Sequence, residues 1–205
     1  MTRQRARRKP LASASNVFLN VPFDRPYEPL FLALIASIVA VGRTPRSVLE
    51  LPEMGRGRLS RILDHMAACA VSFHDLSRAG VPSRFNMPFE LGLACALSEL
   101  KGQHAYALFD RERFRLHRTL SDLDGRDANI HNRSVRQMIT CVLDVLDTRN
   151  GASPLQVFRL YRRLSLATSE LKRQYRVPHV FSPSLFRRTV AVAVELAVAE
   201  RLIEP

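Results

Sequence analysis

The chain has 205 residues, of which 46% are hydrophobic and 24% charged, and its formal net charge is +12. This composition predicts a globular protein with one sizeable core and argues against a disordered or fibrous chain. The longest apolar run, residues 30–41, is too short to span a bilayer, and no apolar signal-peptide core follows the basic start. We therefore expect a cytoplasmic protein without membrane contact.

The distribution of charge bears on possible partners, and the cysteines bear on redox state. The positive charge is concentrated at the two ends of the chain, and residues 1–15 are predicted to be a basic, disordered arm. Such an arm either attracts nucleic acid without sequence preference or is a solvated tail, and both interpretations stay open. Cys69, Cys95 and Cys141 are odd in number and lie in apolar segments, which is typical of reduced core residues.

The next part of the chain, residues 16–149, alternates between strand-like and helix-like patterns. Strands are expected at residues 16–21, 47–51, 70–73 and 104–109, and helices at residues 30–41, 58–68, 88–100 and 134–146. Residues 110–133 look irregular and polar. The alternation predicts an α/β domain with a doubly wound, mainly parallel, flavodoxin-like sheet of about four or five strands.

The pattern changes after the sequence Asn-Gly-Ala-Ser-Pro at residues 150–154. Residues 155–175 are predicted to form an amphipathic basic helix, and residues 184–203 a more apolar one. We expect residues 150–205 to be a helical extension that either packs on the sheet or makes an oligomer contact. The apolar last helix favours self-association into a homo-oligomer.

Two acids stand where the predicted third strand ends and the next helix begins. Asp75 follows the strand, and Glu90 lies near the start of the helix that Asn86 is expected to cap. Asn86 is also a candidate for substrate binding at this edge. Open α/β folds bind ligands at the carboxyl edge of the sheet, so the sequence predicts that both carboxylates reach one site. His74 should face away from Asp75, because side chains alternate along a strand, and we expect it to be packed or on the surface.

A carboxylate suits attack on an N-glycosidic bond, because the transition state is cationic at the anomeric carbon. Glu90 is therefore the candidate nucleophile, and a helix-capping acid is the competing interpretation. Asp75 is the candidate for binding a sugar or orienting a base, or it caps the next turn. Near the first strand, Asn20 can bind a sugar or phosphate, and Phe23 either stacks on a base or packs in the core.

Two further segments carry candidates. The polar loop at residues 122–132 offers Asp127 and His131 to close the site and contact the base or a phosphate. Its acids and histidine match no standard set of metal ligands, so no metal is predicted. Arginines at 56, 58 and 61 either hold a phosphate or are solvated. No glycine-rich run follows the first strand, so the usual dinucleotide fingerprint is absent.

Residues 17–24 (Val-Phe-Leu-Asn-Val-Pro-Phe-Asp), 74–77 (His-Asp-Leu-Ser) and 86–94 (Asn-Met-Pro-Phe-Glu-Leu-Gly-Leu-Ala) together resemble the nucleoside 2-deoxyribosyltransferase-like proteins. That group is close in architecture to bacterial TIR-like domains. The resemblance covers roughly residues 16–147. The loop ending in His131-Asn132 is similar to one in an uncharacterised bacterial branch of the group.

The resemblance implies that Glu90 attacks the anomeric carbon of a nucleoside, nucleotide or NAD, and that Asp75 binds sugar or base. The base would then leave, and the sugar would pass to water or to another base. The transferase pattern has an acid where Asn86 stands here, so hydrolysis is as compatible with this chain as base transfer. The resemblance implies no cofactor. It is also consistent with an effector role in antiphage defence.

Two functions of other classes remain open. A non-catalytic nucleotide sensor on the same fold would bind its ligand at the sheet edge and signal through the C-terminal helices. A nucleic-acid-binding module would use the basic ends, although the sequence shows no basic surface studded with aromatic residues.

Overall fold

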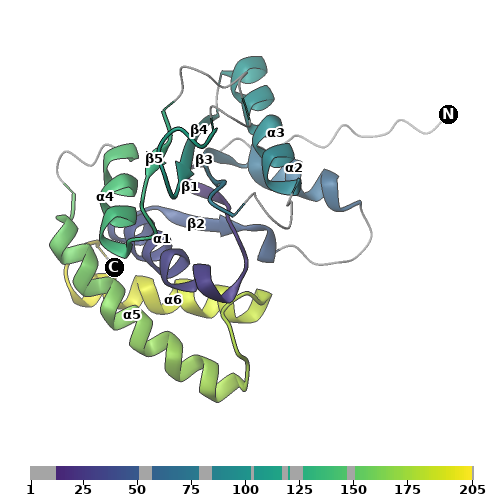
Figure 1. The fold of residues 1–205 in the computed structure, drawn as a ribbon. Helices are drawn as coiled ribbons and strands as arrows, with labels where there is room; N and C mark the ends of the chain where they lie inside the picture. The colour runs from purple at the N-terminus through teal and green to yellow at the C-terminus, as the bar shows by residue number, and fades with distance from the viewer. Residues whose placement is uncertain are drawn as a thin grey trace.

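A five-stranded parallel sheet lies at the centre of the molecule (Figure 1). The computed structural model describes residues 13–50, 57–78, 85–102, 104–116, 120, 127–146 and 151–204. In the order β2-β1-β3-β4-β5, the strands are Thr44–Ser47, Ser13–Asn20, Cys69–Asp75, Ala105–Asp110 and Asn129–Ile130. The predicted doubly wound, flavodoxin-like architecture with C-terminal helices is confirmed.

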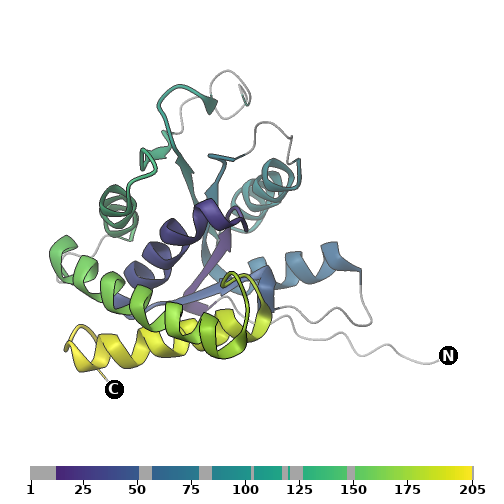
Figure 2. The same ribbon diagram turned by 60° about the horizontal axis from the view of Figure 1, so that its bottom comes forward.

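Helices cover both faces of the sheet (Figure 2). The α-helices are α1 Glu28–Ala40, α2 Arg58–Ala67, α3 Asn86–Lys101, α4 Val135–Val145, α5 Pro154–Tyr175 and α6 Pro183–Ala199, and the 3-10 turns are η1 Arg25–Tyr27 and η2 Val48–Glu50. Helices α2 and α3 pack on one face, and α1 and α4 pack on the other. None of the helices in the described ranges is both long and apolar enough to cross a membrane.

The α1 face holds the larger part of the core. Val17 and Leu19 of β1 and Phe73 of β3 point toward α1 and join one apolar cluster with it. Helix α1 is buried along almost its whole length, because the sheet lies on one side of it and α4, α5 and α6 lie on the others. This accounts for the long apolar run in the sequence, in which Ser37 is the single polar residue and which lacks the polar face of a surface helix.

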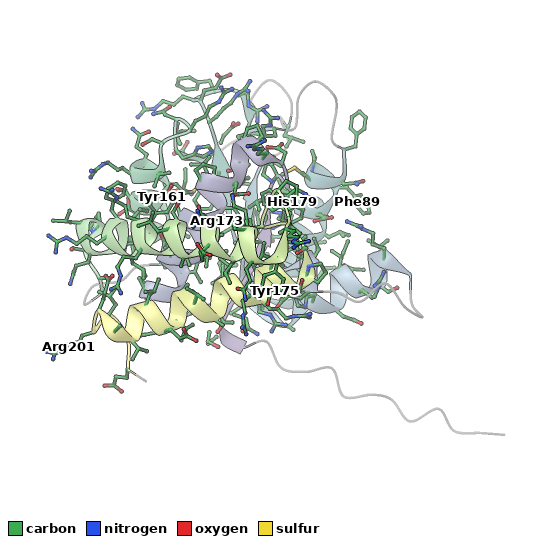
Figure 3. The ribbon with its side chains drawn as sticks, turned by 90° about the horizontal axis from the view of Figure 1, so that it is seen from below. Phe89, Tyr161, Arg173, Tyr175, His179 and Arg201 are labelled. Atoms are coloured by element: carbon green, nitrogen blue, oxygen red, sulfur yellow. The ribbon has the colours of Figure 1, made fainter. Side chains whose placement is uncertain are left out.

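The C-terminal helices pack on α1 rather than directly on the sheet. Helices α5 and α6 lie side by side, and Figure 3 shows Tyr161 and Arg173 along α5 with α6 beside it. Glu28 of α1 ties them down, because its carboxylate accepts hydrogen bonds from the Lys172 ammonium group and the Val180 amide at 3.3 Å. Of the two predicted uses of the extension, packing is observed, and the oligomer contact stays a prediction.

Four sequence predictions were wrong in detail. Strand β1 begins at Ser13, so residues 13–15 belong to the sheet and not to the predicted disordered arm. The second strand lies at Thr44–Ser47, before the predicted residues 47–51, and Pro45 fits there because β2 is an edge strand. A short strand, β5, lies within the region expected to be irregular. Helix α3 begins at Asn86, so Phe85 occupies the N-cap position that was predicted for Asn86. Residues 1–12 of the basic arm, Arg56 and the predicted boundary near residue 150 lie outside the described residues.

Candidate functional site

The chain changes direction across the sheet between β1 and β3. From β1 it passes through α1 to β2 on one side, and it then returns to β3 on the other side. The carboxyl ends of two such strands form a topological switch point, which is where open α/β sheets bind ligands. Asn20 and His74 are register partners at this point, and Asp75 follows directly.

Glu90 lies on the buried stripe of α3. Met87, Leu91 and Ala94 share this stripe at helical spacing and are at most 6% exposed, and Glu90 itself is 8% exposed. No hydrogen bond joins its carboxyl group to another described residue, and its oxygens are not among the fully enclosed polar atoms that lack a partner. Burial raises the pKa of Glu90 to about 7, although the positive charge of Arg58 acts in the opposite direction. An unpartnered acid in an apolar stripe does not serve packing, which makes Glu90 the leading candidate for a functional group.

The adjacent Phe89 faces the opposite way. Its side chain is 54% exposed, and Figure 3 shows it at the α3 side of the molecule, away from the α5–α6 pair. Arg58, the first residue of α2, is also exposed. Its positive charge acts on the carboxyl group of Glu90, so Arg58 lies within electrostatic reach of the candidate nucleophile.

Asn20 is tethered to the same helix. Its Nδ2 donates to the Met87 carbonyl oxygen at 3.0 Å and lies 2.9 Å from Nδ1 of His74. Met87 precedes Glu90 by three residues, a spacing that places two side chains next to each other on a helix. The structure therefore ties Asn20 to the first turn of α3, the helix that carries Glu90.

Asp75 belongs to the other face. Its Oδ2 accepts a hydrogen bond from the Tyr27 hydroxyl and lies 3.1 Å from Nε2 of His131, while Oδ1 accepts one from the Ser77 amide at 2.8 Å. Burial opposes ionisation of this carboxyl group, but His131, Tyr27 and Ser77 together lower the pKa of Asp75. Tyr27 precedes α1 and His131 precedes α4, so Asp75 joins loops on the α1 face.

Among the described residues, no contact joins Asp75 to Glu90, although the sequence predicted that both carboxylates reach one site. Asp75 is 1% exposed, and both of its oxygens have protein partners. A sugar contact by Asp75 stays a prediction, and one of those partners would have to give way to it. The structure also gives His131 another role, because its buried ring contacts Asp75 on one side and accepts the Arg133 amide on the other at 3.0 Å.

The remaining predicted site residues are spread over three places. Phe23 packs against the rings of Phe31 and Phe181, with centroid distances of 6.1 and 5.7 Å, so the core interpretation of Phe23 holds. Asn86 is exposed at the start of α3, where a ligand can reach it. Asp127 lines a pocket of about 490 Å³ beside β4 and β5 that Phe114 also lines, and this pocket is separate from the switch point.

Sequence reasoning missed the polar groups behind Asn20. His74, Ser72 and His104 are buried and linked by hydrogen bonds, as described below. The available signal was the polar pair Ser72 and His74 at i, i+2 in an otherwise apolar strand, which places both side chains on one face.

Within the described ranges, no three His, Cys, Asp or Glu side chains are grouped so that they could hold a metal ion. Comparison of the chain with protein-family models, with curated proteins and with solved structures gave no match.

Proposed function

We propose that the protein cleaves an N-glycosidic bond of a nucleotide-type substrate, with Glu90 as the nucleophile. The observation that carries the proposal is the unpartnered carboxyl group of Glu90 on the buried stripe of α3, the helix to which Asn20 is hydrogen-bonded, within the electrostatic reach of Arg58. The sequence motifs that resemble nucleoside 2-deoxyribosyltransferase-like proteins add support, because the glutamate of that pattern is this residue.

The chemistry needs the ionised form of Glu90. The carboxylate attacks the anomeric carbon, the bond from that carbon to the base breaks, and the base leaves with the electron pair. Water then hydrolyses the glycosyl ester. A pKa of about 7 leaves a substantial ionised fraction at neutral pH. Burial also strengthens the attraction between the carboxylate and the developing positive charge, because the surroundings have a low dielectric constant.

The surroundings of Glu90 also favour one class of leaving group. A neutral base must gain a proton as it leaves, and Asp75, the acid predicted beside Glu90, is held by Tyr27 and His131. A pyridinium such as the nicotinamide of NAD leaves as a neutral molecule and needs no proton. We therefore place NAD and nicotinamide nucleotides ahead of purine nucleosides as substrates.

The test is incubation of the protein with nucleosides, nucleotides and NAD, with chromatography of the freed base. We expect nicotinamide release, and a loss of at least about 100-fold in the Glu90→Gln protein, as is usual when a nucleophile is removed. Glu195→Gln is the matched control, because Glu195 is an exposed glutamate on α6. Equal rates in the Glu90→Gln protein and the parent would refute the proposal.

The pH dependence of kcat/KM separates two roles of the same residue. A nucleophile must be ionised, so kcat/KM should rise with pH up to about 7 and level off above that value. A general acid must be protonated, and it would give the opposite slope. A decline of kcat/KM through pH 7 would therefore exclude Glu90 as the nucleophile.

A nucleotide-binding module without turnover is the second candidate. The burial of Asp75 favours it, because carboxylate-based glycosidases generally use two acids and this one is held by protein groups. Calorimetric binding of a nucleotide that chromatography then recovers intact would support this candidate over the enzyme.

A further inference from the structure

A chain of buried hydrogen bonds runs from β3 to the candidate site. Nδ1 of His104 lies 2.9 Å from the Cys69 carbonyl oxygen, and its Nε2 lies 2.8 Å from the Ser72 hydroxyl. The hydroxyl in turn lies 2.8 Å from Nε2 of His74, whose Nδ1 lies 2.9 Å from Nδ2 of Asn20. Each of these side chains is at most 7% exposed, so solvent does not substitute for the links.

Backbone carbonyl groups fix the direction of every link. A carbonyl oxygen only accepts, so the Asn20 atom 3.0 Å from the Met87 oxygen must be the NH₂ group. Its second hydrogen then points to Nδ1 of His74, which must be the unprotonated nitrogen of the ring. His74 therefore donates from Nε2 to Ser72, Ser72 donates to His104, and His104 donates from Nδ1 to the Cys69 oxygen.

The neutral state of His74 that this arrangement requires is also the state its surroundings favour. Burial, assisted by the neighbouring His104, lowers the pKa of His74 to about 3. His74 therefore stays neutral throughout the neutral pH range, as the direction of the chain requires.

The direction of the chain determines what the Asn20 side chain can offer a ligand. Both hydrogens of its NH₂ group are in use, so the side chain has only Oδ1 left for a ligand. Oδ1 receives no hydrogen bond from the described residues, and it does not belong to the fully enclosed polar atoms that lack a partner. Asn20 therefore presents a fixed acceptor at the carboxyl end of β1.

We propose that Oδ1 of Asn20 accepts a hydrogen bond from a ribose hydroxyl of the substrate, and that His74 is the positioning residue that holds Oδ1 in place. The sequence left open whether Asn20 meets a sugar or a phosphate. An acceptor repels a phosphate oxygen and attracts a hydroxyl, so the direction of the chain selects the sugar. This inference rests on the proposed function, because it takes the ribose of that nucleotide-type substrate as the ligand of Asn20.

The positioning part is testable without any substrate. Long-range ¹H–¹⁵N NMR of histidine side chains reports which ring nitrogen carries the proton. We expect His74 to be neutral with its proton on Nε2 from pH 5 to pH 8, and His104 to carry a proton on Nδ1. A proton on Nδ1 of His74 would overturn the proposal, whatever the enzymatic activity proves to be.

The sugar contact is tested by calorimetry in the Glu90→Gln background, where turnover is removed. The probes are nicotinamide mononucleotide and its 2′-deoxy and 3′-deoxy analogues. In the Glu90→Gln protein, one of the two deoxy analogues should bind about tenfold more weakly than nicotinamide mononucleotide, because it lacks the hydroxyl that makes one hydrogen bond. In the Asn20→Leu variant the parent probe and both analogues should bind equally.

Two variants at position 74 separate positioning from folding. His74→Asn keeps an acceptor near the place of Nδ1, and it should retain the tenfold discrimination. His74→Phe keeps the ring but lacks the acceptor, and it should lose discrimination although Asn20 is intact. The sugar assignment fails if the deoxy analogues bind as tightly as the parent probe, or if Asn20→Leu leaves their penalty unchanged. Either result would leave the test of Glu90 in base release standing.

Discussion

The two faces of the sheet are built on different principles. On the α1 face, one apolar cluster extends from the strands through α1 to α5 and α6. On the α3 face, two smaller apolar clusters flank the buried chain from His104 to Asn20 and the carboxyl group of Glu90. Both faces are covered by helices, but the second one encloses polar groups that packing does not require.

This difference separates what holds the fold together from what the site needs. An apolar face gains free energy from every buried side chain, whereas a buried carboxyl group without a partner reduces stability. The C-terminal helices add to the apolar face, where they pack on α1. We infer that they supply stability to a domain whose other face carries the candidate functional groups.

The largest expected effect is on the apolar face. Phe186 of α6 is fully buried, and its ring centroid lies 5.8 Å from that of Phe31 on α1. Phe186→Ala should lower the free energy of unfolding by about 3–5 kcal/mol, the usual cost of deleting a buried aromatic ring. Chemical denaturation measures this loss. The exposed Val194 of the same helix is the control, and Val194→Ala should change stability by less than about 0.5 kcal/mol.

The same experiment tests the division between the faces. Helix α6 packs against α1, α5 and η2, and its main contacts do not include α3, so binding of nicotinamide mononucleotide should persist wherever the Phe186→Ala protein remains folded. If the affinity falls although the protein is folded, the site depends on the C-terminal helices, and the two faces are coupled.

The next largest effect is a gain in the free energy of unfolding, and it concerns Glu90 on the α3 face. The pKa of Glu90 is about 7 in the folded chain, against an ordinary value of 4.5. Between these two values the folded state binds more protons than the unfolded state, so the free energy of unfolding falls as pH rises. Glu90→Gln removes this dependence. Relative to the parent, the variant should gain up to about 3 kcal/mol between pH 5 and pH 8, since one pKa unit corresponds to about 1.36 kcal/mol.

Thermal or chemical unfolding at both pH values measures this gain, and Glu195→Gln should show none of it. A stability difference between Glu90→Gln and the parent that stays constant from pH 5 to pH 8 would mean that Glu90 titrates normally. The contrast between the two faces would then lose its main electrostatic support.

The sequence was sufficient for the architecture, because the strand and helix patterns are local. It also placed Glu90, since an acid within the apolar stripe of α3 stands out by spacing alone. The structure shows no contact between Glu90 and Asp75 among the described residues, and the reason is geometric. Both residues reach the carboxyl edge, but Asp75 follows Phe73 toward α1, whereas His74 and Asn20 face α3.

The polar contacts were out of reach for a different reason. The hydrogen bond from Tyr27 to Asp75 joins residues 48 apart in the chain, and that from Asn20 to Met87 joins residues 67 apart. Such pairs depend on how strands and helices pack, and no local pattern records them. The edge strand β2 was misplaced because Pro45 and Arg46 give it little strand propensity of its own.

The smallest expected effect concerns Asp75, the acid on the apolar side. Its lowered pKa means that it stabilises the fold above the ordinary value of 3.8, and that this contribution is lost as pH falls through the lowered pKa. Asp75→Asn should therefore reduce the free energy of unfolding at pH 7 by about 2 kcal/mol, the range of a hydrogen bond to a charged group. The difference from the parent should shrink in strong acid, and urea titration at pH 7 and pH 3 measures both values.

With Asp75 in a structural role, nicotinamide release by the folded Asp75→Asn variant should stay within about threefold of the parent. A loss of nicotinamide release as large as that of Glu90→Gln would instead mean that Asp75 takes part in the reaction. Its partners on the α1 face would then have to release it when substrate binds.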